Sequence, residues 1–140
     1  MISTPTPKQP LKIIMDSNAF FVPLQFRIDI FAELERLFGK NITPILLSSV
    51  KKELQTLAQQ SSPKIRKEAI FALNLSDKCK YIKIRTKTNE LTDDTIVDTA
   101  KKWNVPVFTN DKLLKVRLKD ISVPVIYVRE KSRLEIDGMI

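Results

Sequence analysis

The chain has 140 residues, which is enough for one domain with a sizeable core. It contains no histidine, one cysteine and two glycines, which excludes histidine-dependent triads, cysteine-cluster zinc sites, intrachain disulfides and glycine-rich phosphate loops. Its 24 lysines and arginines against 16 acidic residues give a net charge of +8, which favours an acidic partner such as nucleic acid.

Both ends of the chain are polar. Residues 1–10 lack the hydrophobic stretch of a signal peptide, and we expect them to form a flexible tail on a cytoplasmic protein. No apolar run approaches the roughly 20 residues that a membrane-spanning helix needs, so we expect no membrane partner. Residues 131–140 are also polar and charged, and we expect a C-terminal tail there. Residues 11–130 then form the single folded domain.

The first half of this domain alternates predicted strands and helices. The apolar run Leu11–Met15 is typical of a buried strand. Apolar residues at helical spacing predict a helix over residues 27–38, which Gly39 terminates. The elements predicted next are a strand over residues 43–47, a helix that Ser48 or Ser49 caps, and a helix that Ser62 and Pro63 open.

The second half continues the alternation. Residues 81–85 alternate in polarity and predict a strand near an edge, which a polar loop follows. The remaining predicted elements are a helix from Thr92 or Asp93 to Trp103, a strand over 105–109, a basic helix over 111–118 and a strand over 123–128. Strands that alternate with helices predict a three-layer α/β/α domain with a mainly parallel central sheet.

Four acidic residues stand at the ends of predicted elements. Asp16 and Asp111 follow predicted strands, whereas Glu53 and Asp93 lie in the first turns of predicted helices. Ligand sites in such sheets lie beyond the carboxyl ends of the strands. We therefore expect the four carboxylates to converge at one edge of the sheet.

Clustered carboxylates indicate a site for a hard divalent cation, Mg²⁺ or Mn²⁺. Two such ions can clamp the attacking water and the leaving oxygen of a phosphodiester, so the cluster on a basic chain predicts a metal-dependent nuclease. Each acid alone also has a local explanation, such as a turn bond for Asp16 or a helix cap for Asp93 and Asp111. The spacing to the apolar residues of the helix favours Asp93 over Asp94 as the inward acid.

The chain resembles the PIN-domain family over residues 11–128. The similar segments are Ile13-Ile14-Met15-Asp16-Ser17-Asn18, Ser49-Val50-Lys51-Lys52-Glu53-Leu54, Asp93-Asp94-Thr95-Ile96-Val97-Asp98-Thr99-Ala100 and Val107-Phe108-Thr109-Asn110-Asp111. The family usually has threonine where this chain has Ser17, a change that keeps the hydroxyl. Residues 20–38 and 110–118 are further similar to the archaeal and eukaryotic subgroup related to small-subunit rRNA-processing nucleases.

The resemblance implies a role for each of these residues. Asp16, Glu53, Asp93 and Asp111 would be the catalytic acids that bind Mg²⁺ or Mn²⁺ for the hydrolysis of RNA, with residues 11–130 as the nuclease domain. Ser17, Asn18, Thr109 and Asp94 would orient these carboxylates or a water. The basic residues that follow Asp111 are placed to contact RNA phosphates, and they are Lys112, Lys115, Arg117 and Lys119.

Several functions fit this resemblance. The leading hypothesis is an endoribonuclease of rRNA or other RNA processing. A toxin-type PIN ribonuclease has the same chemistry and differs in its partner, and neither an antitoxin nor a ribosome-assembly partner can be identified from the chain. A non-catalytic RNA-binding scaffold is disfavoured because all four acids are present. A phosphohydrolase with Asp16 as nucleophile would be expected to carry Asp-x-Asp. Analogy with related domains implies a homodimer as one arrangement.

Overall fold

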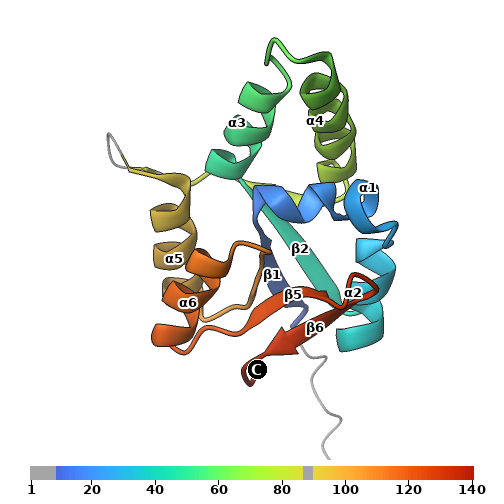
Figure 1. Ribbon diagram of the computed structural model, residues 1–140. Coiled ribbons are helices and arrows are strands. Elements are labelled where there is room, and N and C mark those ends of the chain that lie inside the picture. Colours follow the sequence, from blue (N-terminus) through green and yellow to red (C-terminus); the bar gives the residue numbers. More distant parts are fainter. Residues whose placement is uncertain (1–8, 87–89) are drawn as a thin grey trace, which may run out of the picture.

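The computed structural model describes residues 9–86 and 90–140 (Figure 1). The expected N-terminal tail is therefore described only at Gln9 and Pro10, which are exposed, and residues 87–89 of the expected polar loop also lie outside the described residues. The strands are β1 (Leu11–Met15), β2 (Ile42–Leu47), β3 (Lys80–Ile82), β4 (Val107–Phe108), β5 (Val125–Arg129) and β6 (Arg133–Asp137). The helices are η1 (Ser17–Phe21, a 3-10 helix), α1 (Val22–Phe26), α2 (Ile30–Phe38), α3 (Ser48–Leu57), α4 (Pro63–Ser76), α5 (Thr92–Trp103) and α6 (Lys112–Asp120).

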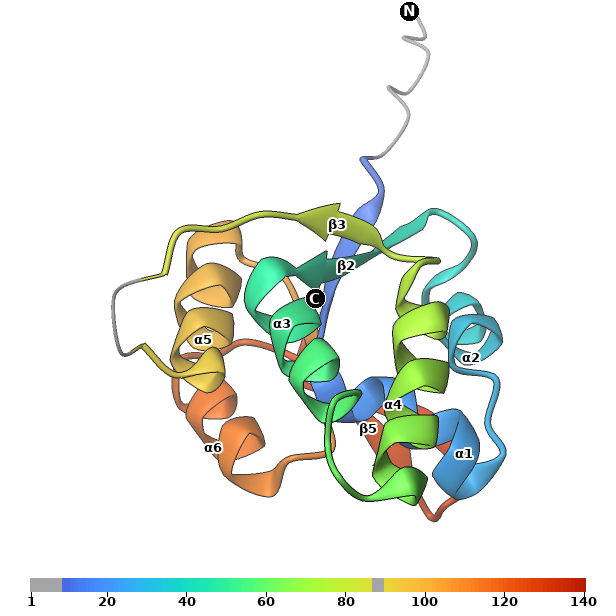
Figure 2. The same ribbon diagram turned by 90° about the horizontal axis from the view of Figure 1, so that it is seen from above.

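The described strands form a six-stranded sheet in the order β3-β2-β1-β4-β5-β6. The first five strands in that order pair in parallel, and β6 pairs antiparallel to β5. Helices α5 and α6 cover one side of the sheet and helices α1 and α2 the other, as both views show (Figures 1 and 2). The chain therefore has the predicted three-layer α/β fold. Within the described part of the chain, every helix is too short or too polar to cross a bilayer.

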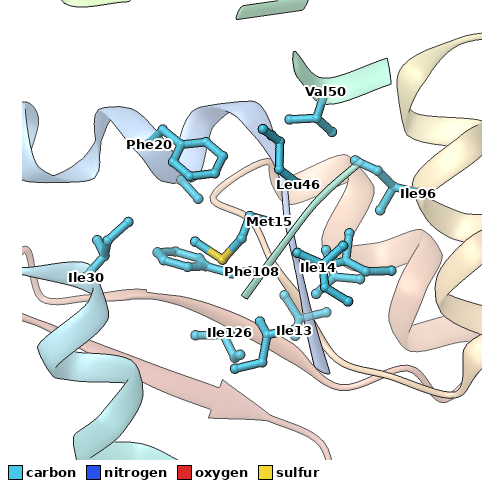
Figure 3. Close-up of a cluster of buried hydrophobic side chains, with 14 of the residues drawn as sticks. Ile13, Ile14, Met15, Phe20, Ile30, Leu46, Val50, Ile96, Phe108 and Ile126 are labelled. Atoms are coloured by element: carbon cyan, nitrogen blue, oxygen red, sulfur yellow. The ribbon is translucent and has the colours of Figure 1, made fainter. Parts of the chain in front are cut away.

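The core lies on both faces of β1. Ile13, Ile14 and Met15 are completely buried, as expected for the centre of a parallel sheet that helices cover on both sides. Figure 3 shows Ile14 near Ile96 of α5, and Met15 near Phe108 of β4. Because both faces of β1 are packed, the residue that follows it has a fixed position at the carboxyl edge of the sheet.

The helix predicted over residues 27–38 is shorter in the structure. Helix α1 ends at Phe26 because the next residue, Arg27, has a left-handed φ of 55°. Helix α2 then begins at Ile30 because Asp29 caps it, with Oδ1 accepting a hydrogen bond of 3.1 Å from Ala32 N. The prediction also missed η1 and α1, which carry the chain away from Asp16.

The expected C-terminal tail over residues 131–140 is wrong, because residues 133–137 form β6. The turn between β5 and β6 places Glu130 and Lys131 at positive φ, a conformation usually occupied by glycine or asparagine, so the usual hairpin signal is missing. Helix α2 holds the new strand in place: Glu33 Oε1 accepts from the Leu134 amide at 3.0 Å, and Arg36 Nη2 donates to the Leu134 carbonyl at 2.9 Å.

Candidate active site

Asp16 lies directly after β1 and is 3% exposed. Its carboxylate accepts hydrogen bonds from Ser17 N at 2.8 Å, Thr109 Oγ1 at 2.7 Å and Asn18 Nδ2 at 3.1 Å. The bond from Ser17 N makes Asp16 the N-cap of η1. Three hydrogen-bond donors thus fix the orientation of this carboxylate at the carboxyl edge of the sheet.

Burial raises the pKa of Asp16 from 3.8 to about 6. The hydrogen bonds from Thr109 and Ser17 oppose this shift because they stabilise the charged form. The negative charges of Asp93 and Glu53 raise the pKa further. The charges of Glu53 on α3 and Asp93 on α5 therefore act on Asp16, which follows β1.

Glu53 contacts this neighbourhood through a hydroxyl. Ser17 is 7% exposed, and its Oγ donates a short hydrogen bond to Glu53 Oε1. Since Ser17 also gives its backbone amide to Asp16, one residue connects the two carboxylates. The sequence predicts that Ser17 orients a carboxylate, and this hydrogen bond is the contact through which it would orient Glu53.

Asp93 and Asp94 point to different partners. Burial raises the pKa of Asp93, and the charges of Asp111 and Glu53 raise it further, whereas Arg117 lowers it. Asp94 Oδ1 accepts from Arg117 Nη2 at 2.9 Å and forms an ion pair with it. Asp94 therefore joins α5 to α6, and the choice of Asp93 as the inward acid stays a prediction.

Asp111 caps α6. Its Oδ1 accepts hydrogen bonds of 2.9 and 3.2 Å from two amides in the first turn of that helix. Its own amide donates to Thr109 Oγ1 at 3.0 Å, and Thr109 in turn donates to Asp16. Asp111 therefore caps α6, and its negative charge also raises the pKa of Asp93, after the larger effect of burial.

Asn110 was missed by the sequence prediction. Its amide donates to Asn18 Oδ1 at 3.0 Å, and its Oδ1 accepts from Val128 N at 3.0 Å. It thus joins the loop after β4 both to η1 and to β5. Its place between Thr109 and Asp111 was the only signal that could have found it, because the bond to Val128 depends on how the strands pair.

The oxygen atoms around Asp16 are the candidate ligands for a divalent cation. Among residues 9–86 and 90–140, no three or more acidic or cysteine side chains come close enough to hold an ion together. Mg²⁺ commonly takes only one or two protein carboxylates, with waters and substrate phosphates as its other ligands. Carboxylate and hydroxyl oxygens suit Mg²⁺ or Mn²⁺, and a cation would stabilise the charged form of Asp16, whose pKa burial raises most and the charges of Asp93 and Glu53 raise further. The residues present therefore fit such an ion.

The four predicted RNA-binding residues all lie on α6, and three of them form ion pairs. Arg117 pairs with Asp94, whereas Lys115 and Lys119 pair with Asp137 at 3.4 and 3.0 Å. The Lys115 ammonium also lies 3.6 Å from the centre of the Tyr127 ring. Lys112 is exposed in the first turn, directly after Asp111. Lys112 is thus the basic residue of α6 next to the acids in sequence.

The profile of the PIN-like domain family matches residues 13–131, which includes all four acids and the sheet from β1 to β5. The chain belongs to the PIN-like domain family. This confirms the resemblance inferred from the spacing of the acidic motifs.

Two curated relatives are similar over most of the chain. Ribonuclease VapC4 of Methanocaldococcus jannaschii is 34% identical over 130 residues, which cover 92% of this chain and 98% of the relative. Ribonuclease VapC9 of Archaeoglobus fulgidus is 28% identical over 124 residues, which cover 89% of this chain and 87% of the relative. The likeness to both is over nearly their full length.

Solved structures support the fold. The PIN domain endonuclease Utp24 superposes with a TM-score of 0.79 at 24% identity, over 95% of this chain and 96% of that chain. VapBC2 from Rickettsia felis, solved bound to a DNA fragment from its promoter, gives a TM-score of 0.59 at 17% identity, over 84% of this chain and 98% of that chain. At these identities the likeness concerns the fold alone.

Proposed function

We propose that this chain is a divalent-metal-dependent endoribonuclease of the toxin type, which a partner antitoxin restrains. The observation that supports the proposal is the buried Asp16 carboxylate at the carboxyl edge of the sheet of a PIN-like domain, where Ser17 bonds both Asp16 and Glu53. The names of the two VapC ribonucleases support RNA as the substrate and favour the toxin type. The expected role in rRNA processing has only the fold-level likeness to Utp24 behind it.

Each residue of the site has a defined task in this proposal. Asp16 and Asp93 would hold the cation, whose positive charge would offset the cost of burying these two carboxylates in their charged form. Thr109 and Asn18 fix the direction of the Asp16 carboxylate, and Ser17 fixes Glu53. A bound Mg²⁺ or Mn²⁺ would supply Lewis-acid stabilisation of the charge that develops on the scissile phosphate.

Helix α6 supplies the substrate contact. Lys112 is exposed beside Asp111 and would hold a phosphate near the acids without reading the base. Lys115, Arg117 and Lys119 would have to exchange their carboxylate partners for phosphates. Exposed ion pairs are worth about 0–1 kcal/mol, so the exchange costs little for Arg117 and Lys119, whereas Lys115 is half-buried and lies over the Tyr127 ring.

The test is cleavage of an end-labelled structured RNA in Mg²⁺, Mn²⁺ or EDTA. Asp16→Asn removes one carboxylate from the cluster, and Asp120→Asn is the matched control because Asp120 is exposed at the far end of α6. We expect cleavage by the wild type and by Asp120→Asn in either metal, and none in EDTA or by Asp16→Asn. RNA binding without cleavage in every metal would instead favour the scaffold hypothesis.

A further inference from the structure

A pocket of about 440 Å³ has Glu53 in its lining. Its walls come from α3 and from the residues before and at the start of α5, and these two helices run side by side (Figure 2). The lining residues used in the argument are Ser49, Lys52, Glu53, Thr56, Glu90 and Thr92. Its size lies within the range of about 300–1,000 Å³ that is typical of small-molecule sites.

One wall carries an unpaired polar atom. Ser49 Oγ is buried and has no hydrogen-bond partner among the residues that the structure describes. Buried hydroxyls are nearly always paired, so this one has bonding capacity left for a group from outside the chain. Rotation about the Cα–Cβ bond to another staggered conformation is the movement that would direct it into the pocket.

The lining suits a nucleoside better than a phosphate. The charged lining groups are the carboxylates of Glu53 and Glu90 and the ammonium of Lys52, so the charges of the walls do not favour an anion. The Thr56 hydroxyl already donates to the Lys52 carbonyl at 3.0 Å but can still accept. The Thr92 hydroxyl and the Glu53 carboxylate can bond a sugar hydroxyl or the edge of a base. Ribose hydroxyls both donate and accept hydrogen bonds. A ribose hydroxyl can therefore bond the Ser49 hydroxyl in either direction.

We propose that this pocket receives the base and ribose of one unpaired nucleotide, next to the scissile phosphate, and that Ser49 bonds the ribose. The inference rests on the proposed function, since it takes RNA as the ligand and Glu53 as part of the cleavage site. It goes further because it assigns a subsite that selects unpaired RNA at one position. The phosphate backbone continues along Lys112, outside the pocket.

The experiment measures binding of a short, fluorescently labelled single-stranded RNA to the full chain in EDTA, where cleavage does not interfere. Thr56→Phe fills the pocket, and Gln55→Phe is the matched control because Gln55 is the exposed neighbour on α3 that does not line it. We expect Thr56→Phe to raise the Kd about tenfold, because one nucleotide loses its hydrogen bonds in the pocket, each of which contributes about 1 kcal/mol. Gln55→Phe should leave the Kd unchanged, with both variants checked for folding by circular dichroism.

A second, smaller change keeps the test independent of the folding of Thr56→Phe. Ser49→Ala should reduce the preference for RNA over the all-2′-deoxy strand of the same sequence, because the ribose loses its partner. Equal Kd values for Thr56→Phe and Gln55→Phe, or an unchanged preference in Ser49→Ala, would overturn the subsite. Metal-dependent cleavage that persists unchanged in both pocket variants would leave the proposed function standing without it. RNA binding that depends on the pocket, without cleavage in any metal, would support the subsite and contradict the proposed ribonuclease activity.

Discussion

Replacement of Asp16 by asparagine tests whether its carboxylate is strained in the absence of metal. The side chain is 3% exposed, and burial is the largest cause of its raised pKa. The folded protein therefore binds the Asp16 proton more tightly than the unfolded chain does. Its favourable contribution is present below about pH 4, falls as the pH rises toward about 6, and is lost above that. At neutral pH the ionised carboxylate destabilises the fold.

The magnitude follows from the shift from 3.8 to about 6, which corresponds to about 3 kcal/mol. Asp16→Asn removes this cost but also one acceptor oxygen, because the new amide nitrogen cannot accept from Thr109 or Asn18. Both of these hydrogen bonds end on Oδ2 of Asp16, and each lost bond costs about 1–1.5 kcal/mol. We therefore expect Asp16→Asn to be more stable than the wild type by up to about 1 kcal/mol near neutral pH.

The assay is urea unfolding in EDTA, followed by the fluorescence of Trp103, the single tryptophan of the chain. The stability advantage of Asp16→Asn should shrink by about 1.4 kcal/mol between about pH 7.5 and about pH 5, because the wild type takes up its proton. Asp120→Asn controls for the loss of one negative charge. A variant less stable than the wild type at both pH values would refute the argument, since the hydrogen bonds of Asp16 would then outweigh its burial.

Three further changes test other parts of the structure. Ser17→Ala should lower the cleavage rate about tenfold with little change in KM, because Glu53 loses the hydroxyl that orients it; single-turnover kinetics measure this. Lys112→Ala should weaken RNA binding and reduce the slope of log K against log salt by about 1, since one phosphate contact is lost. Glu33→Gln should destabilise the fold by about 1 kcal/mol in urea unfolding, because the charge-assisted bond to Leu134 weakens.

Each of these changes has its own control. Thr99→Ala replaces a hydroxyl on α5 that has no part in the acidic cluster, so it should leave the cleavage rate unchanged while Ser17→Ala lowers it. Lys101→Ala removes an exposed charge near the end of α5, and equal salt slopes for it and Lys112→Ala would remove Lys112 from the RNA path. Glu35→Gln changes an exposed glutamate on the same helix as Glu33. Equal losses of unfolding free energy in these two variants would show that the bond from Leu134 to Glu33 does not stabilise the fold.

The sequence alone predicts the layers of the fold and the position of Asp16 at the end of a central strand. The unbroken apolar run before Asp16 predicts a central parallel strand, and buried strands of this kind end at a common edge. The caps that Ser62 and Asp111 provide are local, so they also follow from the sequence. These features depend on neighbouring residues or on a fold rule that holds for every parallel sheet.

Other features depend on contacts between distant residues. The turn through Glu130 and Lys131 lacks glycine, and β6 is held by side chains of α2, so no local pattern marks it. The bond from Val128 to Asn110 depends in the same way on the pairing of β4 with β5. The ion pair of Lys115 with Asp137 likewise depends on β6, because Asp137 is the last residue of that strand.

The most direct test of the account is a titration of the protein with Mn²⁺ by calorimetry in the absence of RNA. Glu53→Gln, Asp93→Asn and Asp94→Asn each remove one negative charge, and the last serves as the matched control because Asp94 faces Arg117. The account predicts that Glu53→Gln and Asp93→Asn weaken Mn²⁺ binding at least tenfold and that Asp94→Asn retains it. Equal affinities in all three variants would contradict a common metal site at this edge of the sheet.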